Sequence, residues 1–172
     1  MTTTERKKRT PSAVLVEQRN QRFYEDGSEV PDDCIYVFLS NSTGHHGKGS
    51  AHIAMHKYGA QYTKAIGLSN RSYALNFLDA TDFILPIGDI VYSIRLFAAF
   101  TRDNKFHRFH VVDFENLFTP EDFKIVVSYF TNCCNCNFPQ SFKGKLNGAI
   151  ALDFKDKILV NKRIREQNSQ NE

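Results

Sequence analysis

The chain has 172 residues, of which 41% are hydrophobic, and its 22 lysines and arginines against 19 aspartates and glutamates give a net charge of +3. This length supports one compact core, and no apolar run approaches the roughly 18 residues of a membrane helix, so no membrane partner is expected. The excess positive charge falls in residues 143–172, outside the central part of the chain. A groove-binding protein needs a basic face on a folded surface, so nucleic acid is not an expected partner.

The two ends of the chain differ in composition from its centre. Residues 1–33 are polar, and no apolar segment of signal-peptide length follows their basic cluster at 6–9. The four cysteines do not make a disulfide framework in a chain of this size, and reduced thiols in a cytoplasm are the simpler interpretation. We predict a loosely ordered polar extension over 1–33, a folded domain over 34–142 and a basic segment over 143–172, in a cytoplasmic protein.

The first structural unit begins where the polar extension ends. Residues 34–39 (CIYVFL) form a continuous apolar run, the pattern of a strand that is covered on both faces. Residues 50–59 place apolar side chains at helical spacing, with Gly59 positioned as a C-terminal cap. The pattern predicts a strand, a glycine-rich loop and a helix.

Strands and helices alternate through the rest of the domain. Residues 119–122 mark a helix start, because Thr119 can cap it, Pro120 suits its first position and two acidic residues follow. Residues 149–160 fit either an edge hairpin or a last helix. The alternation predicts an α/β fold with a mostly parallel sheet and flexible polar ends. Further strands are predicted at 72–78, 108–114 and 134–138, and a further helix at 89–101.

The loop at 40–51 (SNSTGHHGKGSA) follows the first predicted strand, and ligands of open α/β sheets bind where strands end and helices begin. Gly44, Gly47 and Gly49 allow backbone N–H groups to approach a ligand, and the helix start favours an anion. Lys48 adds a positive charge. The loop matches neither the Walker pattern nor the dinucleotide fingerprint. It predicts a phosphate site, and a sharp connection without a ligand is the alternative.

Residues 38–60 (FLSNSTGHHGKGSAHIAMHKYGA) resemble a family of uncharacterised phage and bacterial proteins with the motif F-G-S-N-x-x-G-x-H-G-x-G-A. That family is in turn similar to macro domains, the α/β modules that hold ADP-ribose and related nucleotides. Residues 72–79 and 135–142 resemble two further segments of the family. The resemblance implies a single three-layer macro-like domain. The motif positions matched in this chain are Ser40, Asn41, Gly44, His46, Gly47 and Gly49.

One segment departs from the family pattern. After the third predicted strand the family has a second glycine-rich turn, and this chain has VDFENLFTPED instead. Its side chains cannot imitate glycines, and Glu115 would repel an anion. Either half of the ligand site is remodelled, or the protein has kept the scaffold and lost the ligand.

Asn41 and His46 are the candidate catalytic residues, since their positions in the loop would place them near the ribose or the reacting bond of a bound nucleotide. His46 could donate a hydrogen bond or transfer a proton, and simple hydrogen bonding within the loop is the rival role. Asp79 and Asp113 lie at or just beyond predicted strand ends and could reach a sugar or base, and Phe114 could stack on a base. The candidate ligand-binding residues are Ser40, Gly44, His45, Gly47, Lys48, Gly49, Ser50, Asp79, Asp113 and Phe114.

No metal or other cofactor is expected. His52 and His56 have the spacing of two metal ligands on one helix face, but the glutamate of the HExxH pattern and an acidic third ligand are absent. Cys134 and Cys136 lack a second pair at metal-binding spacing, so buried small side chains are the favoured interpretation.

The function we expect is binding, with or without hydrolysis, of an ADP-ribose-like or signalling nucleotide. If the protein is phage-encoded, as the resemblance suggests, it would act in the host cytoplasm against a nucleotide-based defence. The alternative is a non-enzymatic module that has kept a degenerate nucleotide-binding scaffold and binds a host protein.

Overall fold

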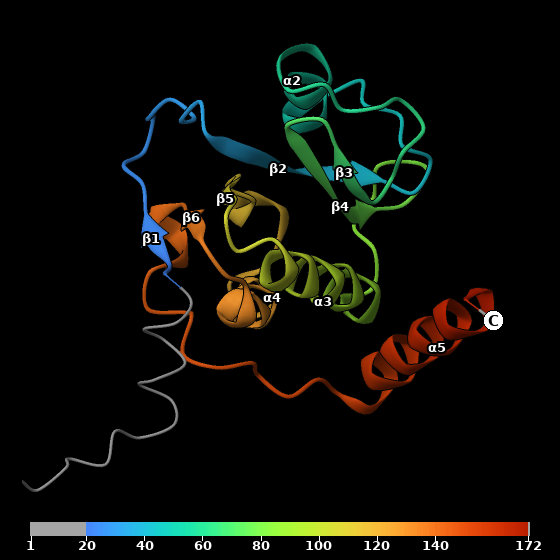
Figure 1. The fold of residues 1–172 in the computed structure, drawn as a ribbon. Coiled ribbons are helices and arrows are strands. Elements are labelled where there is room, and N and C mark those ends of the chain that lie inside the picture. Colours follow the sequence, from blue (N-terminus) through green and yellow to red (C-terminus); the bar gives the residue numbers. More distant parts are fainter. Residues whose placement is uncertain (1–19, 172) are drawn as a thin grey trace, which may run out of the picture.

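A six-stranded sheet runs through the computed structural model, which describes residues 20–171 (Figure 1). The strand order is β1-β6-β5-β2-β4-β3, and every neighbouring pair is parallel except β3 with β4. This α/β fold with a mostly parallel sheet confirms the predicted fold class. The strands are β1 (Arg22–Phe23), β2 (Cys34–Asn41), β3 (Gly67–Ser69), β4 (Ser72–Leu78), β5 (Arg108–Val111) and β6 (Cys136–Phe138).

Helices cover both faces of the sheet. The α-helices are α2 (Gly49–Lys57), α3 (Ile87–Asp103), α4 (Pro120–Ser128) and α5 (Phe154–Gln170), and the 3-10 turns are η1 (Glu115–Leu117), η2 (Tyr129–Asn132) and η3 (Gln140–Phe142). Helix α2 lies on one side of the sheet, and α3 and α4 lie on the other (Figure 1). The start of α4 is as predicted, because the Thr119 side chain accepts a hydrogen bond from the Asp122 amide and Pro120 follows it.

The central strand β2 distributes its side chains between the two layers. All eight of its residues are buried, as the continuous apolar run predicts. Ile35, Val37 and Leu39 belong to the large core beneath α3 and α4, and the alternate residues Tyr36 and Phe38 pack beneath α2. Truncation of a buried phenylalanine of this kind costs roughly 3–5 kcal/mol.

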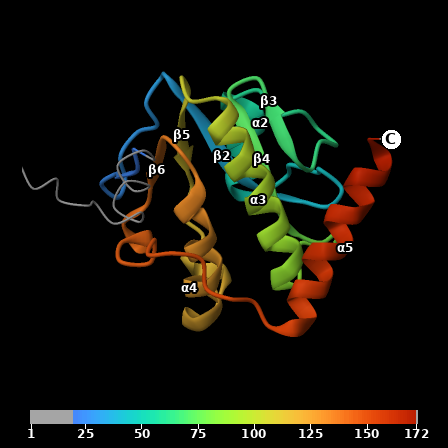
Figure 2. The ribbon, with the colours of Figure 1, turned by 60° about the horizontal axis from the view of Figure 1, so that its bottom comes forward.

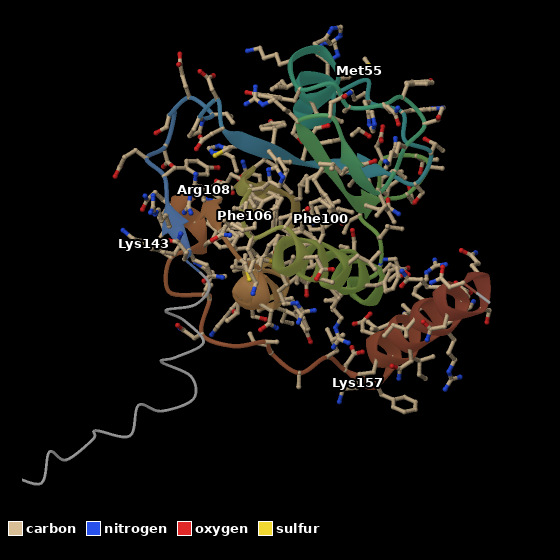
Figure 3. The ribbon with its side chains drawn as sticks, in the orientation of Figure 1. Met55, Phe100, Phe106, Arg108, Lys143 and Lys157 are labelled. Carbon is tan, nitrogen blue, oxygen red and sulfur yellow. The ribbon has the colours of Figure 1, made fainter. Side chains whose placement is uncertain are left out.

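The two layers differ in size. The large core holds most of the phenylalanines, whereas the layer under α2 consists mainly of alanines and tyrosines. Phe100 packs against the large core and Met55 against the smaller one, and both are labelled in Figure 3. Helix α2 therefore approaches the sheet closely through Ala51 and Ala54.

Two strands are shorter than predicted, each for a local reason. Strand β6 begins at Cys136 because Asn135 has a left-handed backbone (φ 54°), which interrupts an extended chain. Strand β5 ends at Val111, and the Asp113 side chain then accepts a hydrogen bond from the Glu115 amide, which starts η1.

The C-terminal segment folds onto the domain. Of the two alternatives for 149–160, an edge hairpin and a last helix, the structure has the helix. Helix α5 lies along α3 (Figure 2) and occupies most of the segment that was predicted to be a flexible polar end. Val160 is the only residue of α5 that is fully buried, so its sequence resembles that of a solvated segment. Polar contacts dock it: the Gly88 amide donates to Asp156, Arg163 pairs with Asp89 at 2.9 Å, and Tyr92 donates to Gln167.

The segment before β2 also belongs to the domain, within the part that is described. Strand β1 pairs with β6, and the Gln21 side-chain amide lies within hydrogen-bond distance of the carbonyl oxygens of Phe130, Thr131 and Cys133. The Tyr24 ring stacks on His110 at 4.1 Å. Residues 20–33 therefore lie against the folded domain, and the remainder of the predicted extension, 1–19, lies outside the described residues.

Gly88 sets the distance between α3 and α5. A Cβ built on it would lie 2.6 Å from the Asp156 carbonyl oxygen and 2.8 Å from the Leu159 Cβ. In an exposed helix, glycine to alanine gains roughly 0.8–1 kcal/mol. We expect Gly88→Ala instead to lower the free energy of unfolding by about 1–3 kcal/mol, because the two backbones must separate. Urea unfolding measures it, with the exposed Asn161→Ala on α5 as control. A stabilised Gly88→Ala variant would contradict the close packing.

His110 should make stability depend on pH. Burial lowers the pKa of this histidine from 6.5 to about 4. The folded state therefore favours the neutral ring, and stability is lost as the pH falls from about 6.5 towards 4, by about 2–3 kcal/mol. His110→Phe should flatten the dependence of unfolding free energy on pH in this window, and the exposed His107→Gln should not. An unchanged slope in His110→Phe would show that another group titrates.

Candidate functional site

A pocket of about 620 Å³ lies beyond the carboxyl ends of β2, β4 and β5. The chain leaves β2 for α2 on one face of the sheet and leaves β4 for α3 on the other. When neighbouring strands connect to helices on opposite faces of the sheet, a crevice opens beyond their carboxyl ends. Open α/β proteins bind ligands in this crevice. The lining residues are Leu39, Asn41, His45, Gly47, Lys48, Gly49, Ser50, Ala51, Leu78, Ala80, Asp82, Asp113, Phe114, Glu115, Asn116 and Leu117.

The predicted site residues divide into two groups in this structure. Eight of them line the pocket: Asn41, His45, Gly47, Lys48, Gly49, Ser50, Asp113 and Phe114. The other four, Ser40, Gly44, His46 and Asp79, do not belong to its lining. Each of these four uses its hydrogen-bonding groups or its backbone conformation to build the loops around the pocket.

Asn41 organises the glycine loop through both ends of its side chain. The Oδ1 atom accepts hydrogen bonds from the His45 amide at 3.0 Å and the Thr43 hydroxyl at 2.8 Å. The Nδ2 group donates to Asp82 Oδ1 at 2.8 Å. The side chain is buried, so these bonds replace water that it cannot reach. Asn41 joins the loop after β2 to the loop after β4.

Gly44 is required by the fold of the loop. Its φ is 70°, and an added Cβ would lie 2.3 Å from the Thr63 carbonyl carbon. Its carbonyl oxygen also accepts a hydrogen bond from the Thr63 amide at 2.9 Å. No side chain fits at this position, and the loop packs against 61–64 for that reason.

His46 and Ser40 are both buried at 1% exposure. The His46 Nε2 lies 2.8 Å from the Gln61 carbonyl oxygen, and its ring meets the Phe38 ring edge-on. The Ser40 hydroxyl donates to the Asn41 carbonyl. Neither side chain therefore lines the pocket: His46 holds the loop against Phe38 and Gln61, and the Ser40 hydroxyl is engaged by the neighbouring backbone.

The Asp79 carboxylate is engaged in hydrogen bonds within the turn at residues 79–83. The carboxylate accepts hydrogen bonds from the Thr81 hydroxyl and amide and from the Phe83 amide. These bonds, the Thr81 hydroxyl first, lower the pKa of the carboxyl group. The turn exposes the side chain of Asp82, which has a left-handed backbone (φ 66°), to the pocket. Asp82 is a pocket residue that the sequence did not indicate, because no local pattern connects it to Asn41.

The start of α2 forms one wall. Lys48 is the N-cap residue and provides no side-chain cap, and Gly49 to Ala51 line the pocket. The free N–H groups of a first helical turn carry partial positive charge. The Lys48 side chain is 87% exposed, and its ammonium group lies 3.9 Å from Asp82 Oδ2. This wall suits an anion.

The η1 turn forms the opposite wall, and it corrects one prediction. Phe114 is 3% exposed and packs edge-on against Phe77 and Phe142, each with ring centroids 5.2 Å apart. Its ring belongs to the large core, so it is not free to stack on a base. Leu117 is 43% exposed and is a lining residue that the sequence did not indicate.

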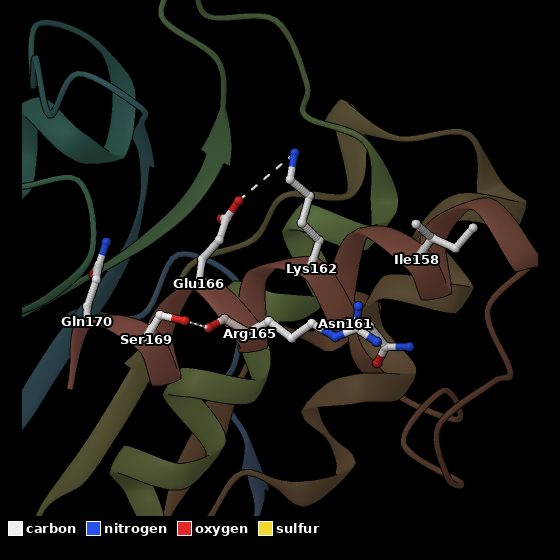
Figure 4. A pocket seen from close by; sticks show the side chains of 7 residues that line it. All are labelled: Ile158, Asn161, Lys162, Arg165, Glu166, Ser169 and Gln170. Carbon is white, nitrogen blue, oxygen red and sulfur yellow. Dashed lines mark hydrogen bonds and ion pairs between the residues drawn. The ribbon is translucent and has the colours of Figure 1, made fainter. Parts of the chain in front are cut away.

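A second hollow lies on the outer side of α5 (Figure 4). All seven residues that line it come from that one helix, from Ile158 to Gln170. The Glu166 carboxylate lies within ion-pair distance of Lys162 and Arg163, and the Ser169 hydroxyl donates to the Arg165 carbonyl. A groove along a single helix encloses no ligand, so the pocket beside α2 is the better candidate site.

The described residues contain no group of three or more histidine, cysteine and acidic side chains that could hold a metal. The His52 and His56 rings are 4.2 Å apart on α2, without a third ligand. The cysteines within residues 20–171 form no disulfide, and burial raises the pKa of the Cys136 thiol well above its usual range. This thiol is therefore unsuited to act as a nucleophile.

No family model, curated protein or solved structure matches the chain. What is established is the fold class: an α/β domain with a six-stranded, mostly parallel sheet. Over residues 20–171, no helix has the length and apolar character to cross a membrane.

Substitution tests whether the Asn41 side chain stabilises the glycine loop. We expect Asn41→Ala to lower the free energy of unfolding by about 2–3 kcal/mol, because it leaves the His45 amide unpaired in a partly buried loop. Asn116→Ala is the control, since Asn116 lines the same pocket and its side chain makes no hydrogen bond within the described residues. Urea unfolding curves of both variants measure the difference. Equal stabilities would show that the Asn41 side chain does not hold the loop.

Proposed function

We propose that this protein binds a phosphate-bearing nucleotide of ADP-ribose-like or signalling type in the pocket beyond β2, β4 and β5. One observation carries the proposal. The same pocket contains the start of α2, with Lys48, and an apolar surface large enough for a nucleoside. Drug-sized ligands occupy pockets of about 300–1,000 Å³, mostly apolar with a few placed polar groups.

The phosphate would lie against the first turn of α2. The Gly49 to Ala51 backbone borders the pocket there, and Lys48 is the only lysine or arginine among the lining residues. Helix starts of this kind bind phosphate through their free N–H groups. The Ser50 hydroxyl accepts a hydrogen bond from the Leu39 amide at 3.2 Å, which ties this turn to the end of β2.

The nucleoside would lie across the apolar part of the pocket, formed by Leu39, Leu78 and Leu117. The Asp113 carboxylate is oriented by hydrogen bonds from the Ser141 hydroxyl and the Glu115 amide, at 2.9 and 3.0 Å. A carboxylate held in this way can accept a hydrogen bond from a sugar hydroxyl or a base amino group. The resemblance of 38–60 to macro-like proteins supports the same class of ligand.

Binding is the activity that the geometry supports best. The polar atoms of the Asn41 side chain are engaged in the loop, and His46 is buried outside the pocket lining. The His46 Nδ1 atom has no hydrogen-bond partner within residues 20–171, but it is buried and His46 does not line the pocket, so we propose no bond cleavage.

We propose a protein-binding module as the second candidate function. Two large apolar side chains are exposed on loops that contribute to the pocket rim: Leu117 at 43% in η1 and Phe83 at 71% beside Asp82. Contiguous exposed apolar patches mark protein interaction sites, and these two side chains would contribute to such a surface. A partner there would cover the pocket rather than enter it.

Thermal unfolding with AMP, ADP-ribose, NAD and cyclic ADP-ribose tests the binding proposal. A ligand at about 100 times its dissociation constant adds roughly 2.7 kcal/mol to the unfolding free energy, which raises the melting temperature by several degrees. Gly47→Val should abolish the shift without unfolding the protein, because a Cβ on Gly47 meets no atom within 4 Å and points into open space.

Ala151→Val is the matched control, because it adds two methyl groups to an exposed position that does not line the pocket. It should keep the full thermal shift. If none of the four nucleotides moves the melting temperature at millimolar concentration, nucleotide binding is wrong and the protein-binding function becomes the better candidate.

A further inference from the structure

We infer that the pocket selects a ligand with a single phosphate group and disfavours a pyrophosphate. This inference rests on the proposed function, because it concerns the charge of the nucleotide that the same pocket accepts. Within the proposed class of nucleotides it favours phosphate monoesters, whose remaining polar groups donate hydrogen bonds, over ADP-ribose itself, which carries a pyrophosphate.

The charges that line the pocket are unequal in number. One ammonium group, that of Lys48, faces three carboxylates, those of Asp82, Asp113 and Glu115. A pocket that binds several phosphates usually supplies several cations or a second set of backbone N–H groups. Here the second wall is η1, which contributes carboxylates where such donors would be needed.

Two of the carboxylates are held in place by the loops. Asp82 accepts a hydrogen bond from Asn41 Nδ2 at 2.8 Å and lies 3.9 Å from the Lys48 ammonium group. Asp113 accepts from the Ser141 hydroxyl and the Glu115 amide. These negative charges cannot turn away from a ligand without breaking the loops that carry them.

Glu115 contributes the third negative charge, and its carboxylate differs from the other two because the surrounding loops do not hold it. Its backbone takes part in η1, but its carboxylate makes no hydrogen bond or ion pair within residues 20–171. It is available to accept hydrogen bonds from a ligand, and it can be neutralised without removing a structural contact.

The consequence for a ligand follows from Coulomb's law. A first phosphate can accept hydrogen bonds from the α2 amides and is attracted to the Lys48 ammonium group. A second phosphate joined to it through one oxygen cannot leave the charged region, finds no further cation among the lining residues and meets the carboxylates. Hydroxyl and amino groups gain from the same carboxylates, because they donate hydrogen bonds. A ligand with one phosphate and a hydroxyl-bearing sugar would therefore place its phosphate at the α2 wall and its hydroxyl groups near the carboxylates.

Isothermal titration of the full chain with adenosine, AMP, ADP and ADP-ribose tests this inference. AMP should bind more tightly than adenosine, because of its phosphate, and more tightly than ADP and ADP-ribose. Glu115→Gln should reduce the preference for AMP over ADP by roughly threefold, the size expected for one charge in a solvent-screened site. Glu29→Gln is the control, because it removes the same charge at an exposed position away from the pocket.

The outcomes separate this inference from the proposed function. If ADP or ADP-ribose binds as tightly as AMP, single-phosphate selection is wrong and nucleotide binding stands. If Glu115→Gln leaves the ratio of AMP to ADP affinity unchanged, or Glu29→Gln changes it equally, the carboxylates of the pocket do not set the selection. If none of the four compounds binds, the proposed function is wrong and the inference fails with it.

Discussion

Burial of β2 on both faces of the sheet is the constraint on which the rest of the structure depends. Its alternate side chains supply both the core beneath α3 and α4 and the thinner layer beneath α2. A strand that is covered in this way has neighbours on both edges, here β4 and β5. The carboxyl end of β2 therefore lies between two strand ends, and the loops that leave these three strands must meet around one space. The pocket is a result of this topology.

Most polar side chains near the pocket stabilise the loops around it. Asn41, Asp79 and His46 each pair with backbone or side-chain groups of those loops. A long loop needs such internal bonds, because its buried backbone groups have no regular ladder to complete. The groups that remain available for a ligand are Lys48, the α2 amides and the carboxylates of Asp113 and Glu115, and their charges differ between the two walls. The chemistry of the site depends on this division more than on the number of polar residues.

Helix α5 shows a different form of stabilisation. Few of its side chains are apolar and buried, so the hydrophobic effect alone would hold it weakly. Its docking combines a close backbone approach at Gly88 with polar contacts to α3, such as Arg163 with Asp89. Ion pairs at a surface contribute little individually, and the close approach gives them a fixed geometry.

The sequence by itself determined the elements whose signals are local. The apolar run of β2, the Thr119–Pro120 start of α4 and the position of the glycine loop follow from periodicity, capping and backbone conformation, which act over a few neighbouring residues. Only the tertiary structure decided that Phe114 enters the core, that Asp82 reaches Asn41 across 41 positions in the chain, and that α5 docks on α3. These contacts join residues far apart in sequence, and the energies that select them arise from packing and desolvation once the sheet has formed.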